Sequence, residues 1–132
     1  MSPIAPVILV GGAAVLAFDA AASLASRRFG FAYTSAAAGS WVIYAVVGFL
    51  AGRSAGLAVA APAGAAMGFV DATLGWYVSW QIGPGRVAGG LTVSRWVTAA
   101  VTVTLLAAAI GALGGLAARL LAADAAARGL TL

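Results

Sequence analysis

Two aspartates, Asp19 and Asp71, stand inside long apolar stretches of the 132-residue chain and are the residues best suited to chemistry. Asp19 occurs in "AFDAAAS" and Asp71 in "GFVDATLG". A carboxyl group that faces hydrocarbon has no partner, and an Asp at the centre of a membrane helix costs about 2.5–3.5 kcal/mol. We therefore expect each acid to face another helix or a wet cavity, where it can take up a proton or a small cation.

Hydroxyl groups accompany the acids at helical spacing. Ser23 follows Asp19 by four residues, Tyr44 follows Ser40 by four, and Thr102 follows Thr98 by four. Residues four apart lie on one face of a helix, so these hydroxyls could line a shared interior. The polar or transport site that we predict consists of Asp19, Asp71, Ser23, Tyr44, Thr98 and Thr102.

A purely structural role for the acids remains open at this point. A buried Asp can hydrogen-bond to Tyr44, to a threonine, or to an arginine head that reaches inward, and so fix the register of two helices. Two acids at similar depth favour a functional site over such a role.

The elements that hold these residues follow from composition. The chain is 64% hydrophobic and 8% charged, and its mean hydropathy is +1.08. A soluble domain carries about 25% charged residues, so a lipid bilayer is the expected surrounding. Four apolar stretches each have a length close to the roughly 20 residues that a helix needs to cross a membrane. We expect helices at about 4–26, 29–50, 57–80 and 96–118, then a short C-terminal tail at 119–132.

The predicted fold class is therefore an all-α membrane protein, a four-helix transmembrane bundle made of two antiparallel hairpins. Turns are expected where glycine, proline and arginine gather: at Arg27–Arg28, around Arg53, and from Gly83 to Gly90. Short connections make successive helices antiparallel, so the first and third run the same way. At 1.5 Å per residue, Asp19 and Asp71 then differ in depth by roughly 6 Å and could approach each other. Residues 1–132 leave no room for a second, soluble domain.

Glycines repeat at the four-residue spacing that lets membrane helices pack closely. We assign most of them to packing inside the chain, while a homo-oligomer or a larger membrane complex remains open. The predicted packing positions are Gly48, Gly52, Gly64, Gly68, Gly75, Gly111 and Gly115.

Several function classes find no support in the residues. The chain has no cysteine and no histidine, and no nucleophile–base pair is visible, so we expect no enzyme, no metal site and no cofactor. "GPG" and "GALGG" lack the lysine or the preceding strand of nucleotide-binding loops. The net charge of +4 comes from loop arginines and favours lipid headgroups over nucleic acid. A cleaved signal peptide is the less favoured interpretation of the first span, because no basic residue precedes it.

The numbers of arginines on the two sides of the membrane favour one orientation of the chain only slightly. Arg53, Arg119 and Arg128 fall on one side, and four arginines fall on the other: Arg27, Arg28, Arg86 and Arg95. The bias leans toward termini outside the cytoplasm, and insertion in both directions is the alternative. We expect a multi-pass protein of a bacterial inner membrane that handles a proton or small solute as a transporter or channel subunit. The alternative is a non-transporting accessory subunit that docks other helices through glycine-rich faces.

Overall fold

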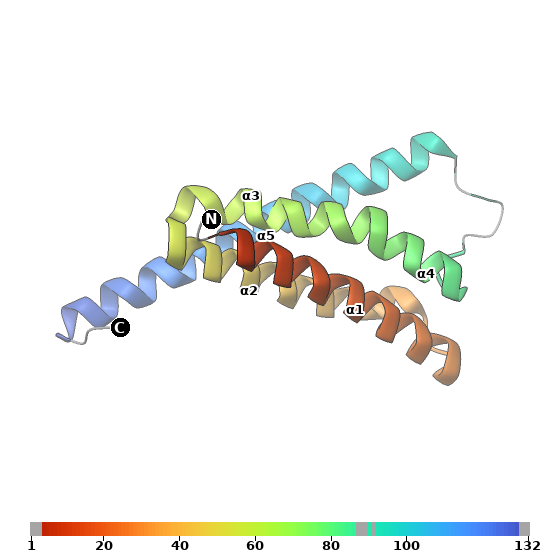
Figure 1. Cartoon of the computed structure of the whole chain (residues 1–132), viewed down its shortest axis with the longest axis horizontal. Helices are drawn as coiled ribbons and strands as arrows, with labels where there is room; N and C mark the ends of the chain where they lie inside the picture. Colours follow the sequence, from red (N-terminus) through yellow and green to blue (C-terminus); the bar gives the residue numbers. More distant parts are fainter. Residues whose placement is uncertain (1–3, 87–89, 91, 130–132) are drawn as a thin grey trace.

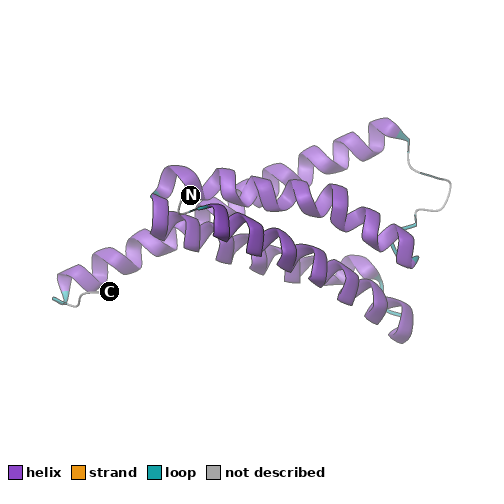
Figure 2. Ribbon diagram, in the orientation of Figure 1, coloured by secondary structure: helices purple, strands orange, loops and turns teal. Residues whose placement is uncertain are grey.

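The computed structural model describes residues 4–86, 90 and 92–129, and in these residues the chain is helical with no strand (Figure 1, Figure 2). Four helical runs are long and apolar enough to cross a membrane: Ala5–Phe29, Tyr33–Ala55, Leu57–Ile82 and Val93–Ala127. The predicted all-α four-helix arrangement is confirmed.

The first hairpin differs from the expected boundaries. Helix α1 (Ala5–Phe29) runs through both arginines and ends at Gly30, whose φ of 74° lets its N–H bond the carbonyl of Ser26. A 3₁₀ turn, η1 (Tyr33–Ala36), precedes α2 (Ala37–Ala55), so the second helix begins later than the predicted residue 29. Trp41 consequently lies near the start of α2.

The connection between the two hairpins is a single residue. Arg53 lies in the last turn of α2, not in a loop, and Gly56 (φ 88°) alone separates α2 from α3 (Leu57–Val70). A cation at a helix C-terminus complements the carbonyl groups that end there. Pro62 stands inside α3, past its first turn.

The third span contains a widened turn. After α3 comes η2 (Asp71–Gly75), a π-helical turn in which the Trp76 N–H reaches the carbonyl of Asp71, and α4 (Trp76–Ile82) follows. Gly83 (φ 125°) ends α4. The expected turn from Gly83 to Gly90 is described only in part, because residues 87–89 lie outside the described residues.

The last helix, α5 (Val93–Ala127), has 35 residues and measures about 52 Å at the standard rise. Thr92 caps its start by accepting a hydrogen bond from the Arg95 N–H, and Asp124 pairs with Arg128 near its end at 3.0 Å. The helix therefore exceeds the predicted 96–118 at both ends. It packs along α2 and α3, and its first turns diverge from α4 (Figure 1).

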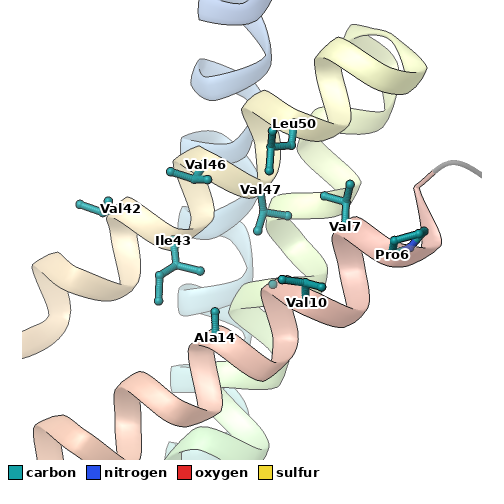
Figure 3. A pocket seen from close by; sticks show the side chains of 10 residues that line it. Pro6, Val7, Val10, Ala14, Val42, Ile43, Val46, Val47 and Leu50 are labelled. Atoms are coloured by element: carbon teal, nitrogen blue, oxygen red, sulfur yellow. The ribbon is translucent and has the colours of Figure 1, made fainter.

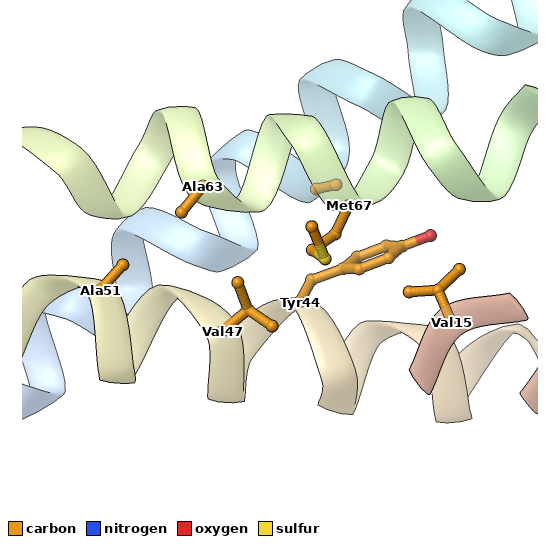
Figure 4. Close-up of a cluster of buried hydrophobic side chains, with 7 residues drawn as sticks. Val15, Tyr44, Val47, Ala51, Ala63 and Met67 are labelled. Carbon is orange, nitrogen blue, oxygen red and sulfur yellow. The ribbon is translucent and has the colours of Figure 1, made fainter. Parts of the chain in front are cut away.

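The core lies where α1, α2, α3 and α5 meet. Tyr44 and Met67 are its largest hydrophobic side chains, and the cluster comprises Val15, Tyr44, Val47, Ala51, Ala63, Met67 and Ala107 (Figure 4). Large apolar side chains such as Leu9, Val10 and Leu105 are exposed on the outside. A surface of this kind suits lipid as the surrounding medium.

Candidate functional site

Asp19 is buried in α1, with 1% of its surface exposed. The turn at Gly30 brings the chain back so that η1 lies beside α1, and the Tyr33 hydroxyl donates to Asp19 Oδ1 at 2.9 Å. One oxygen of the carboxyl group thereby has a fixed donor.

Asp71 opens the widened turn η2. Its Oδ2 accepts a hydrogen bond from the Tyr44 hydroxyl. The Tyr44 ring packs in the hydrophobic cluster near Met67 and Val15, and its hydroxyl points out of that cluster (Figure 4). Packing fixes the ring, so it also fixes the donor that Asp71 receives.

The other oxygens of the two acids meet at Gly75. A Cβ atom added to Gly75 would lie 3.3 Å from Asp71 Oδ1 and in overlapping contact with Asp19 Oδ2. Residue 75 must therefore be glycine for both carboxyl groups to occupy this place. The structure brings Asp19 and Asp71 together, as their similar depth had suggested.

Two buried hydroxyls extend the polar region from Asp19 toward the end of the bundle that carries η1 and the end of α4. Ser23 on α1 and Ser79 on α4 are both 0% exposed. Within the described part of the chain, their Oγ atoms and Asp19 Oδ2 have no hydrogen-bond partner. Buried polar atoms in this condition need water or a ligand.

The polar region ends in a hollow at the surface. Ser26, one turn beyond Ser23, donates to the carbonyl of Phe31 at 2.7 Å and lines a cavity of about 570 Å³. Arg27, Gln81 and Arg86 line the same cavity. Polar side chains thus follow one another from the acids to this surface.

The arginines of this hollow bond to backbone carbonyls rather than to the acids. Arg27 donates to the Ile82 carbonyl at 3.3 Å, and Arg86 donates to the Trp80 carbonyl at 3.2 Å while its guanidinium lies over the Trp80 ring. In residues 4–86, 90 and 92–129, the one ion pair is the exposed Arg128–Asp124 contact. Neither Asp19 nor Asp71 has an arginine partner there.

The opposite side of the acid pair is apolar. Val15 precedes Asp19 by one turn and Met67 precedes Asp71 by one turn, and both are fully buried. With Tyr44 they separate the acids from the turn at Gly56 (Figure 4). The acid pair therefore has polar neighbours on one side along the bundle and hydrophobic neighbours on the other.

Four of the six predicted polar residues gather here, and two do not. Asp19, Asp71, Ser23 and Tyr44 belong to the site, whereas Thr98 and Thr102 are exposed on the outside of α5. The Thr102 hydroxyl donates to the Thr98 carbonyl at 2.8 Å, so it is satisfied within its own helix and needs no inward partner.

Two residues of the site, Tyr33 and Ser79, were not predicted from the sequence. Tyr33 was placed inside a regular helix, and only the Gly30 turn brings it to Asp19. Ser79 carried a usable signal, because it lies four residues after Gly75 and eight after Asp71.

The predicted packing glycines lie at helix–helix contacts within the chain. Gly52 faces Gly115, with 2.7 Å between an added Cβ and the Gly115 Cα, and Gly111 faces Gly64 at 2.8 Å by the same measure. Gly48 also faces Gly111, Gly68 faces Ala107 and Val103 on α5, and Gly75 faces the acids. These close approaches join α2, α3 and α5.

An apolar groove of about 410 Å³ runs between α1 and α2 on the outside of the bundle (Figure 3). Val10 and Ala14 form one wall, and Val42, Ile43 and Val46 form the other. The groove contains no group that could do chemistry, and it suits an acyl chain or another helix.

Comparison of the chain with protein-family models, with curated protein sequences and with solved structures finds no match. The described residues hold no group of three His, Cys, Asp or Glu side chains placed to bind a metal ion. The chain is a four-helix protein whose composition fits a multi-pass membrane location.

Proposed function

We propose that the protein is a small membrane transporter or channel subunit that binds and releases protons at Asp19 and Asp71, in a bacterial inner membrane. The observation that carries this proposal is the meeting at Gly75 of two carboxyl groups, that of the buried Asp19 and that of the partly buried Asp71. Two carboxylates this close repel each other strongly in a medium of low dielectric constant, and one shared proton removes that repulsion.

The tyrosines leave the right oxygens free for this role. Tyr33 bonds Asp19 Oδ1 and Tyr44 bonds Asp71 Oδ2, so the oxygens that adjoin Gly75 are those without a tyrosine donor. A proton held between them has two acceptors and no competing donor from the tyrosines.

A route to water supports the exchange of that proton. The buried hydroxyls of Ser23 and Ser79 lie between the acids and the hollow that Ser26 lines. Hydroxyls donate and accept, so with a few water molecules they form a chain along which a proton can pass. The widened turn η2 also fits this role, because such turns occur often at functional sites.

The direct test is proton flux in proteoliposomes that enclose a pH-sensitive dye, under an imposed potassium gradient with valinomycin. Wild type should carry protons, and Asp19→Asn and Asp71→Asn should each lower the flux to that of empty vesicles. Asp124→Asn is the matched control, because Asp124 is exposed outside the site and pairs with Arg128. It should keep the wild-type flux.

Two results would refute the proposal: wild-type flux equal to that of empty vesicles, or wild-type flux in the Asp19→Asn/Asp71→Asn double variant. Helix content by circular dichroism and elution volume in detergent would establish that each variant is folded.

The groove between α1 and α2 favours a second candidate function, a non-transporting accessory subunit. On this account another membrane helix occupies the groove, and the acids only hold α1 against η2. The double Asn variant would then lose thermal stability, and neither it nor wild type would move protons.

A further inference from the structure

Aromatic side chains surround the acid pair in two cavities. The first has about 200 Å³ and lies between α1, η1, α2 and α5, where Phe18, Trp41 and Tyr44 line it with both acids. The second has about 290 Å³, and Trp76 and Trp96 line it with Asp71. Tyr33 and Asp71 line both cavities.

No basic side chain lines either cavity among the described residues. Arg27 and Arg86 are bonded to backbone carbonyls at the surface. The described residues therefore offer the two acids no cationic side chain, and a carboxylate sheltered inside the bundle needs either a proton or a cationic partner.

We infer that these cavities bind a small organic monocation, an amine or a quaternary ammonium ion, which exchanges with the proton of the Asp19–Asp71 pair. This inference rests on the proposed function, because the cation and the proton use the same carboxyl groups. Ring faces of Trp and Tyr attract an ammonium group, and a carboxylate adds charge attraction. An inorganic cation would instead need several oxygen ligands, and the first cavity offers those of both acids, Thr34 and Ser40, so sodium and potassium are included in the test.

The size of the cavities limits the ligand. Both are smaller than the roughly 300–1,000 Å³ of pockets that hold drug-sized molecules. The ligand is therefore an ammonium ion with a few carbon atoms around the nitrogen.

The position of the cavities indicates how such an ion enters. Trp41 is 47% exposed and Leu106 is 42% exposed, so the wall of the first cavity is also part of the outer surface. The start of α5, which carries Trp96, diverges from α4 (Figure 1). An amphiphilic cation that collects at the membrane interface can thus approach from the side of the bundle.

The test is a titration of the purified protein in detergent with tetramethylammonium and tetraethylammonium chloride, read by tryptophan fluorescence and by calorimetry. Sodium and potassium chloride at equal ionic strength are the reference salts. Wild type should bind one of the ammonium ions saturably, and lowering the pH should weaken this binding, because the proton competes.

Single-residue variants test separately how much the carboxylate and the aromatic rings contribute to ammonium binding. Asp71→Asn should abolish saturable binding, and Trp76→Leu and Trp96→Leu should each weaken it by roughly three- to tenfold. Trp80→Leu is the matched control, because Trp80 lies outside both cavities beneath Arg86, and its affinity should equal that of wild type.

The inference is overturned if wild type binds neither ammonium ion, if sodium produces the same saturable signal, or if Trp76→Leu and Trp96→Leu bind as wild type does. Its failure is distinct from that of the proposed function. Proton flux that depends on Asp19 without ammonium binding removes only the inference, whereas ammonium binding without any proton flux removes the proton role and the exchange and leaves the ammonium site.

Discussion

At the scale of residues, each of the two acids has one oxygen that accepts a hydrogen bond from a tyrosine and one oxygen that faces the other acid at Gly75. Because the two carboxyl groups are so close, the addition of a single methyl group beside them should disturb the site. A methyl group at residue 75 would occupy the place of Asp19 Oδ2, which is an effect on the site and not on the bundle as a whole.

Gly75→Ala should therefore abolish proton flux and leave the helix content unchanged, because the methyl group displaces the Asp19 carboxyl from Asp71. Flux in proteoliposomes and circular dichroism measure the two effects. Gly12→Ala is the matched control, because an added Cβ there meets nothing within 4 Å. A Gly75→Ala protein with normal flux would mean that the two carboxyl groups need not meet.

Tyr44→Phe should lower the free energy of unfolding by about 1–3 kcal/mol, because Asp71 Oδ2 then loses its hydrogen-bond donor in a partly buried place. Unfolding in mixed micelles with increasing denaturing detergent measures this change. Tyr77→Phe, at a side chain that is 55% exposed, should change stability by much less. Equal stability of the Tyr44→Phe variant and wild type would count against a bonded Tyr44–Asp71 pair.

Some residues of the site could be predicted from the sequence, and others could not. A carboxyl group in an apolar stretch must find a sheltered place, so Asp19 and Asp71 could be identified from composition alone. A threonine has an alternative partner in its own helix, as Thr102 shows, and its face cannot be inferred from spacing. Tyr33 depended on a turn at Gly30 that no apolar pattern reveals.

At the scale of elements, the two ends of the bundle differ. The half near the turn at Gly56 is closed by apolar packing of α1, α2, α3 and α5 around Met67. The other half holds Ser23, Ser79 and the hollow at Ser26. In this conformation the acid pair should therefore exchange with water through one end only, and proton transport requires a second conformation that opens the other end.

Ser26→Cys tests this asymmetry. A charged, membrane-impermeant thiol reagent should modify Cys at residue 26 from one side of the membrane and inhibit proton flux, because Ser26 lines the hollow. Ala51→Cys, in the closed half and 0% exposed, should resist the reagent from both sides. Equal labelling of the two positions would contradict one-sided access. The chain has no native cysteine, so no background labelling arises.

Close packing of α5 depends on glycine. Gly111→Ala places a methyl group 2.8 Å from the Gly64 Cα and 2.7 Å from the Ala60 carbonyl oxygen, and backbone atoms cannot turn aside. We expect a loss of about 1–3 kcal/mol in unfolding free energy, measured by the same detergent titration. Gly12→Ala should be neutral or stabilising, since alanine favours helix. A stable Gly111→Ala variant would show that α5 can shift outward at little cost.

At the scale of the whole molecule, the apolar exterior and four long helices follow from composition, and the number and order of spans could be predicted. Helix ends were less predictable. A given residue type can stand inside a helix or at its end, and local capping decides which of the two occurs. Arg27 and Arg53 stayed in helices, and α5 extended past both expected limits. The widened turn at Asp71 has no apolar signature, and it was not foreseen.

The central claim is that Asp19 and Asp71 hold one proton between them in the bilayer. Infrared spectroscopy of the reconstituted protein during pH titration tests this directly, through the carbonyl band of a protonated carboxylic acid and its shift in D₂O. We predict such a band in wild type and in Asp124→Asn at neutral pH, and its absence in the Asp19→Asn/Asp71→Asn double variant. A wild-type spectrum in which only carboxylate bands appear at neutral pH would contradict the account.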